Sequence, residues 1–84
     1  EMSNWKYKIE IDALGRNARD VATELKQRLE LLPASFRALS HNMTSLNEMI
    51  WWLDDVNDDE SANEVLYDLY NWGDRHRLYL FLNV

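Results

Sequence analysis

Hydrophobic and polar residues alternate strictly over the first segment of the chain, residues 5–12. The apolar set is aromatic and β-branched, and a period of two is typical of a strand with one buried face. We therefore predict a strand here. Its apolar face carries Trp5, Tyr7, Ile9 and Ile11, and its solvated face carries Lys6, Lys8, Glu10 and Asp12.

Apolar residues then recur every three or four positions, which predicts amphipathic helices. Asn17 is expected to cap the first helix and Pro33 to stop it. Three or four helices are expected, over residues 17–32, 35–42, 45–56 and 61–72.

Short polar motifs predict where the later helices begin and end. Ser45 with Glu48, and Ser61 with Glu64, have the spacing of a capping box at a helix N-terminus. Gly73 is expected to end the last helix, because glycine is common just after a helix C-terminus.

The chain closes with a second alternating segment, residues 77–84. We predict one α+β domain over residues 1–84, with the terminal strands paired in one sheet and the helices on one face. Glu1 is interpreted as an added residue ahead of a native Met2. The pairing direction of the strands is left open. One face of the last strand carries Leu78, Leu80, Leu82 and Val84, and the other carries Tyr79 and Phe81.

Tyr79 and Phe81 are expected to be half exposed on the back of this sheet, which also has open edges. They are therefore candidates for self-association into a homodimer. The alternative is that the aliphatic stems of lysines shield the two rings.

The net charge of −6 is concentrated in one part of the chain. Residues 54–74 hold eight acidic residues and no basic one, residues 75–84 add two arginines, and the rest balances. A field of this sign repels nucleic acid and attracts basic surfaces. We therefore expect a basic protein partner and no direct nucleic-acid binding.

The composition excludes several classes of protein. The chain has no cysteine, so disulfides, thiolate catalysis and cysteine-ligated metals are excluded. No apolar run approaches the length of a membrane span, and no signal peptide opens the chain. A soluble, cytoplasmic protein without membrane contact is expected.

Candidate catalytic and metal-binding motifs are weak. Asp55, Asn57 and Asp59 match the first ligands of a calcium-binding EF-hand loop, but Glu60 and Leu66 stand where glycine and glutamate are required. The histidines, His41 and His76, have no metal-ligand or catalytic spacing. We therefore expect no enzyme activity, no cofactor and no metal site.

Two aromatic residues are predicted to project from acidic helix faces. On a helical wheel Trp51 points away from the core of its helix, and so does Tyr67, whereas Trp52 and Trp72 point toward the core. Tryptophan and tyrosine are typical binding hot spots. The alternative is that another element covers both rings.

The segments WKYKIEI (residues 5–11) and VLYDLYNWGD (residues 65–74) resemble short uncharacterised proteins of bacteriophages and bacteria. Those proteins also pair a Trp-led first strand with an acidic last helix before a C-terminal strand. The resemblance implies a phage or mobile-element origin and brings no function with it. The order of elements is also similar to barstar-type ribonuclease inhibitors, but the middle strand that they need is not evident, so that assignment is not adopted.

The pattern favours a non-enzymatic acidic protein that engages a basic protein surface, as a nucleic-acid mimic, nuclease inhibitor, immunity protein or phage anti-defence factor would. The alternative is a small structural or regulatory homodimer that associates through its sheet, with the acids serving solubility. A calcium-dependent module is the third hypothesis. The expected partner-binding residues are Trp51, Asp54, Asp55, Asp58, Asp59, Glu60, Glu64, Tyr67 and Asp68.

Overall fold

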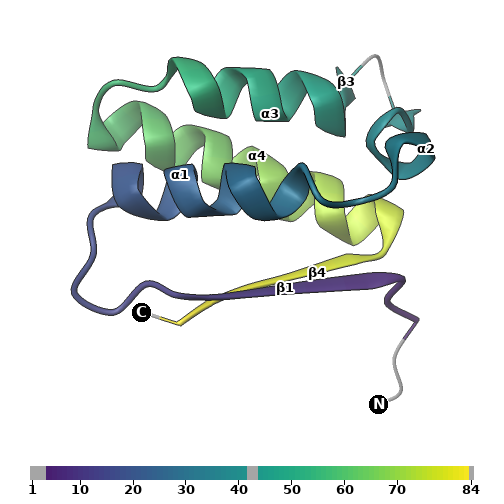
Figure 1. Cartoon of the computed structure of the whole chain (residues 1–84), viewed down its shortest axis with the longest axis horizontal. Helices are drawn as coiled ribbons and strands as arrows, with labels where there is room; N and C mark the ends of the chain where they lie inside the picture. Colours follow the sequence, from purple (N-terminus) through teal and green to yellow (C-terminus); the bar gives the residue numbers. More distant parts are fainter. Residues whose placement is uncertain (1–3, 42–43, 84) are drawn as a thin grey trace.

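The computed structural model describes residues 4–41 and 44–83. Figure 1 shows the order of its elements along the chain. These elements are β1 (Tyr7–Asp12), α1 (Ala18–Leu29), α2 (Ala34–Arg37), β2 (Ser40–His41), β3 (Thr44–Ser45), α3 (Leu46–Asp55), α4 (Asp59–His76) and β4 (Leu78–Asn83).

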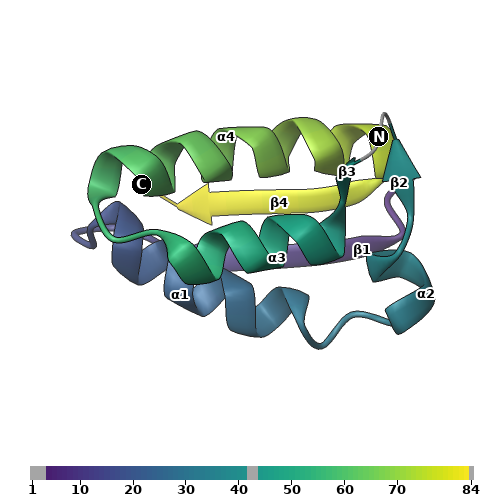
Figure 2. The ribbon, with the colours of Figure 1, turned by 90° about the horizontal axis from the view of Figure 1, so that it is seen from above.

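The elements form three layers (Figures 1 and 2). The sheet of β1 and β4 is the first layer, and α1 and α4 lie side by side on one of its faces. Helix α3 packs on both α1 and α4, on the side away from the sheet. The predicted α+β domain, with its helices on one face of a sheet of the terminal strands, is therefore confirmed.

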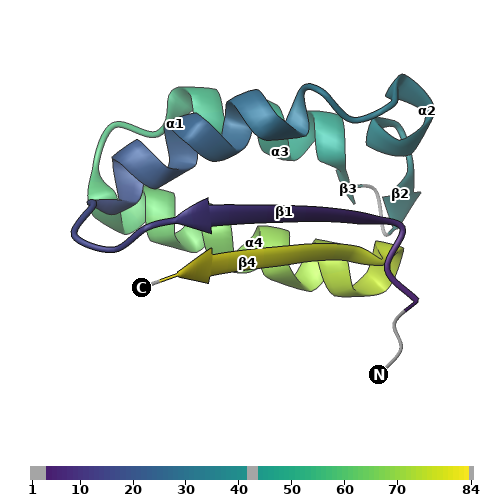
Figure 3. The same ribbon diagram turned by 60° about the horizontal axis from the view of Figure 1, so that its bottom comes forward.

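The two strands of this sheet run parallel, as Figure 3 shows. The register pairs Ile9 with Leu80, and the Lys6 N–H donates to the Arg77 carbonyl over 2.7 Å. Parallel neighbours need a long crossover connection, and here the whole helical part of the chain supplies it. The parallel direction also places the start of β1 and the end of β4 at opposite ends of the sheet.

The core is continuous from the helix-facing side of the sheet to the underside of α3. Ile9, Ile11, Leu78 and Leu80 are buried on the sheet, as the alternation predicted. Trp5 differs from its prediction. It precedes β1, and its ring contacts Tyr79 at 5.4 Å on the open face of the sheet. The period of two constrains only residues inside the ladder, so Trp5 is free to turn to the other side.

An aromatic cluster closes one end of the core. The Phe36 ring of α2 makes edge contacts with Tyr7 at 4.8 Å and with Trp72 at 5.5 Å. The indole N–H of the fully buried Trp72 donates to the Thr44 carbonyl over 3.2 Å. These contacts fix α2 and β3 against the C-terminal part of α4.

The segment after Pro33 differs from the predicted helix over residues 35–42. Helix α2 ends at Arg37, and the short antiparallel pair β2–β3 follows it, joining Ser40 to Ser45 and His41 to Thr44. Residue 42 lies outside the described residues. Residues 40–45 are rich in Ser, Thr and Asn, whose side chains compete with helical hydrogen bonds.

The N-terminal caps are confirmed in two of three cases. Asn17 caps α1, and Ser45 with Glu48 forms a complete capping box on α3. The box predicted at Ser61 and Glu64 is wrong. Helix α4 begins earlier, because the Asp58 side chain accepts a hydrogen bond from the Ser61 N–H over 2.7 Å.

The predicted end of the last helix at Gly73 is also wrong. Gly73 lies inside α4 and is buried, and the helix continues to His76. A Cβ at this position would come within 2.7 Å of the Leu78 carbonyl oxygen, so a close approach to β4 requires the glycine. Arg77 makes the left-handed turn instead, with φ of 62°, and leads into β4. The predicted strand over 77–84 accordingly begins at Leu78, and Val84 lies outside the described residues.

Candidate functional site

The outward face of α4 gathers four of the predicted partner-binding residues. Glu60, Glu64 and Asp68 follow one another four apart and Tyr67 lies three residues after Glu64, so the four residues lie on one side of the helix. The Tyr67 ring is 68% exposed at the centre of this side, so its predicted outward direction is confirmed. A shallow surface depression is lined by Glu60, Asn63, Glu64, Tyr67 and Asp68, and we name these residues the α4 acidic face.

The carboxylates of this face are unneutralised. Within the described part of the chain, no lysine or arginine forms an ion pair with Glu60, Glu64 or Asp68. These three acids follow one another at i,i+4, an arrangement of like charges that destabilises a helix by about 0.2–0.5 kcal/mol per pair. The α4 acidic face therefore combines an exposed phenol ring with negative charge that the fold does not use.

Three other predicted acids have structural partners. Asp54 of α3 pairs with Lys26 of α1 at 3.1 Å, and this hydrogen bond raises the pKa of Lys26 above its usual value. Asp59 accepts a hydrogen bond from the Arg19 N–H over 3.3 Å and lies 3.5 Å from its guanidinium. The first contact joins α1 to α3, and the second joins α1 to α4.

Asp58 serves as the cap of α4. The backbone N–H of Ser61 holds the pKa of the Asp58 carboxyl below its usual value, because it donates to the ionised form. The predicted acids therefore fall into two groups. The first group stabilises the fold through an ion pair or a helix cap and consists of Asp54, Asp58 and Asp59. The second group is exposed to solvent without an ion pair among the described residues. Asp55, at the end of α3, belongs to the second group within the described residues.

Trp51 lies apart from the α4 acidic face. Its side chain is 68% exposed, so the predicted outward direction is confirmed. It stands one turn from Asp54, whose ion pair with Lys26 marks the side of α3 nearer to α1. Trp51 does not line the depression on α4. Trp52, predicted to point inward, is 39% exposed and only partly covered.

The EF-hand-like residues are divided between elements. Asp55 ends α3, Asn57 follows it, and Asp59 opens α4, where it contacts Arg19. Among the described residues, no group of three or more acidic or histidine side chains is placed to hold a metal ion. His76 stacks on Trp72 with 3.9 Å between ring centroids, and its Nδ1 lies 3.1 Å from the Trp72 carbonyl oxygen.

The open face of the sheet carries the predicted self-association residues. Tyr79 is half-buried and Phe81 is 45% exposed, and their rings stack at 6.3 Å. The Lys8 ammonium lies 5.7 Å from the centre of the Tyr79 ring, within cation–π range. Lysine therefore covers Tyr79 in part, as the shielding alternative expected, whereas Phe81 keeps about half of its surface.

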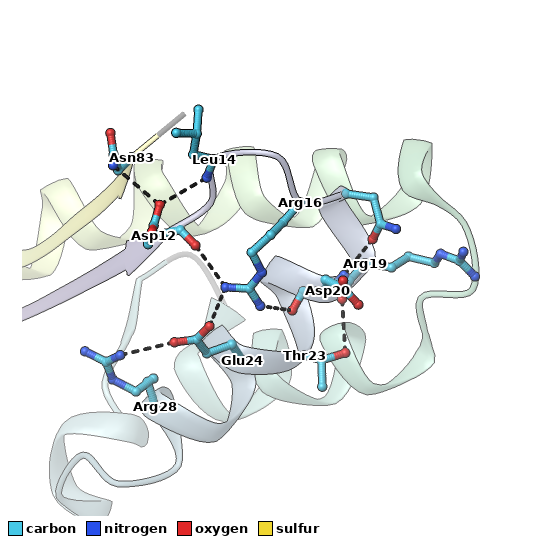
Figure 4. Close-up of polar contacts among 10 residues, drawn as sticks. Asp12, Leu14, Arg16, Arg19, Asp20, Thr23, Glu24, Arg28 and Asn83 are labelled. Carbon is cyan, nitrogen blue, oxygen red and sulfur yellow. Dashed lines mark hydrogen bonds and ion pairs between the residues drawn. The ribbon is translucent and has the colours of Figure 1, made fainter.

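A polar network at the end of β1 was not foreseen from the sequence (Figure 4). The Arg16 guanidinium donates to Glu24 over 2.6 Å, to the Asp12 carbonyl over 2.9 Å and to the Asp20 carbonyl over 3.2 Å. These contacts join the end of β1 to the first turns of α1. The sequence gives no signal for them, because the spacing of eight residues between Arg16 and Glu24 crosses a loop.

Comparison with known proteins finds no matching family model, no matching curated protein and no matching solved structure. In the described part of the chain, no helix combines the length and the apolar character needed to cross a membrane.

Proposed function

We propose that the protein is a non-enzymatic acidic binding protein that engages a basic protein surface through the α4 acidic face. Nucleic-acid mimics, nuclease inhibitors, immunity proteins and phage anti-defence factors work in this way. One observation carries the proposal: Tyr67 is 68% exposed among three carboxylates that have no ion pair in the described structure.

The chemistry of this face suits arginine and lysine. Unpaired carboxylates accelerate association with a basic surface through long-range attraction, and they form charge-assisted hydrogen bonds on contact. The Tyr67 ring offers a cation–π contact and a large area for desolvation. Trp51 and Asp55 lie outside the depression, so they would contribute only with a partner that extends over α3.

A titration with an arginine-rich peptide, followed by the amide resonances of the ¹⁵N-labelled protein, tests this proposal. Shifts are expected at Glu60, Glu64, Tyr67 and Asp68, and affinity should fall steeply as salt rises, because exposed charges are screened. A variant with Glu60→Gln, Glu64→Gln and Asp68→Asn should lose most of the binding at low salt. Tyr67→Ala should weaken binding about fivefold or more, corresponding to about 1 kcal/mol.

The matched control carries Glu10→Gln, Asp12→Asn and Asp20→Asn, which remove three negative charges from the sheet and the first turn of α1. This control should bind the peptide as the wild type does. Equal losses in both variants would show that net charge alone attracts the peptide and would contradict the assignment to α4. Capture from a host lysate with the wild type and the α4 variant then identifies the natural partner by its selective loss.

A further inference from the structure

The open face of the sheet is the other prominent uncovered surface of the described chain. No described helix packs on it, as Figure 3 shows from below. On this face β4 carries the partly exposed aromatic rings Tyr79 and Phe81, followed by Asn83, and Trp5 lies against Tyr79. An uncovered aromatic sheet face commonly marks an interaction site.

The charges on the neighbouring strand are ordered by sign. The open face of β1 carries Lys8 in the first half of the strand and Glu10 and Asp12 in the second half, and Lys6 directly precedes the strand. The parallel register places the middle of this series, Ile9, beside Leu80, which is also the midpoint between Tyr79 and Phe81. A strip that is positive at one end and negative at the other is complementary to itself when it is reversed.

We propose that this face binds a second copy of the chain, face to face, with the strands of the two copies antiparallel. A twofold axis lying in the interface, parallel to the Ile9–Leu80 row and directly over it, would place each β1 opposite the partner's β1 and each β4 opposite the partner's β4. Residues then meet in reversed order: Lys8 faces Glu10 of the partner subunit, Lys6 faces Asp12 of the partner subunit, and Tyr79 faces Phe81 of the partner subunit. Symmetry forms every pair twice.

The spacing of packed sheets fits these pairs. Sheets stack about 10 Å apart with their strands within about 30° of each other. Extended lysine and glutamate side chains together span such a gap, and the stacked rings fill it beside them. The opposite arrangement, with the strands of both copies in the same direction, would place Lys8 over Tyr79 of the partner subunit and would leave the acids unpaired.

Association through the sheet edges is disfavoured by the helices. Helix α1 extends past the outer side of β1, and α4 extends past that of β4, both on the covered face (Figure 2). A strand added at either edge by a second copy would bring these helices together.

The size of the face indicates a weak dimer. Two strands of six residues each cover about 20 Å by 10 Å, which is smaller than the roughly 800 Å² per partner of a standard stable interface. A dissociation constant between about 10 µM and 1 mM is therefore expected. This inference is independent of the α4 acidic face, which lies on a different element.

Charge reversal and mixing test the arrangement by sedimentation equilibrium. Lys8→Glu and Glu10→Lys should each raise the dimer dissociation constant at least about tenfold, because each change turns two attractive pairs into two like-charge pairs. An equimolar mixture of the two variants should regain wild-type association, since each altered residue then faces an opposite charge. Recovery in the mixture also demonstrates that both variants are folded.

The controls are Glu64→Lys and Arg75→Glu, which change the net charge by the same amounts on α4. Both should dimerise as the wild type does. The proposal is overturned if the wild type stays monomeric up to about 1 mM. It is also overturned if a dimer forms that neither reversal weakens, or if the mixture does not recover, because the antiparallel face-to-face pairing requires all three results.

Discussion

At the residue scale, Trp51 of α3 and Trp72 of α4 have opposite environments. Trp72 is fully buried and hydrogen-bonded to Thr44, whereas Trp51 is largely exposed. Truncating a large buried side chain leaves a cavity that surrounding atoms fill only in part. The same residue type therefore has a structural role in α4 and is available for contact with other molecules in α3.

We predict that Trp51→Ala lowers the free energy of unfolding by less than about 1 kcal/mol and that Trp72→Ala lowers it by about 3–5 kcal/mol. Urea denaturation followed by circular dichroism measures both. Because Trp72→Ala can unfold so small a domain, Trp72→Phe serves as a milder variant. A large loss for Trp51→Ala would mean that its indole is covered by the fold.

A second prediction concerns Gly73→Ala, where the sign of the change in stability tests the close approach of α4 to β4. Alanine in place of a helical glycine ordinarily stabilises a protein by about 0.5–1 kcal/mol. Here the new Cβ would meet the Leu78 carbonyl oxygen at 2.7 Å, so backbone must move. We expect Gly73→Ala to destabilise the protein by about 1–3 kcal/mol, whereas Asn71→Ala, at an exposed position of the same helix, should stabilise it slightly. Stabilisation by Gly73→Ala would contradict the close approach of α4 to β4.

At the element scale, the acids of α3 and α4 have opposite effects on stability. Glu48 reaches back to the Ser45 N–H over 3.3 Å and completes a capping box. Glu64 lies between Glu60 and Asp68 at i,i+4 on α4, where like charges repel. One acid strengthens its helix, and the other is tolerated at a cost.

We therefore predict that Glu64→Gln raises the free energy of unfolding by about 0.4–1 kcal/mol at low salt, because it removes two repulsive pairs. Glu48→Gln should lower it by a few tenths of a kcal/mol. Thermal unfolding at low and high salt measures both, and the gain for Glu64→Gln should shrink in high salt. A destabilising Glu64→Gln would reveal an attractive contact and would argue against a free binding surface.

The cap of α4 predicts a pH dependence. The pKa of Asp58 is lower in the folded chain than its ordinary value of 3.8, so the ionised cap stabilises the fold above 3.8. This contribution is lost as the pH falls through the folded pKa. Asp58→Ser keeps a cap that does not titrate. The difference in the free energy of unfolding between the wild type and Asp58→Ser should therefore be constant near neutral pH. In acid the wild type should lose stability relative to Asp58→Ser. A difference independent of pH would contradict the Asp58 cap.

At the scale of the whole molecule, the parallel pairing of the terminal strands sets the positions of all helices. A parallel pair cannot be joined by a tight turn, so the intervening chain crosses over one face of the sheet. This crossover places α1 and α4 on the sheet and α3 on both of them. The other face is left open, and both proposed interaction surfaces follow from this single asymmetry.

Engineered cysteines test the parallel register in this cysteine-free chain. Lys8 and Tyr79 are register partners, so the pair Lys8→Cys and Tyr79→Cys should oxidise readily to an intramolecular disulfide. In the pair Lys8→Cys and Asn83→Cys the second site is displaced by four residues, about 13 Å, and no such bond should form. Mass spectrometry at low protein concentration distinguishes the two, and the reverse result would indicate an antiparallel sheet.

Periodicity alone predicted the longer elements of this protein, β1, α1, α3, α4 and β4, and most of its core, although not every element boundary. Alternation predicted β1 and β4, three-and-four spacing predicted the buried sides of α1, α3 and α4, and the outward direction of Trp51 and Tyr67 followed from the same spacing. These features depend on neighbours within one or two turns. The charge imbalance of residues 54–74 was likewise visible without a structure.

Contacts between distant segments decided the rest. The parallel direction of the strands, Gly73 inside α4, and the division of the acids between the pairs Asp54–Lys26 and Asp59–Arg19 and the unpaired α4 acidic face all depend on which elements meet in space. A local pattern records which side of an element is buried, because burial repeats with the period of that element. It does not record which residue lies opposite, because that is set by the packing of whole elements against one another.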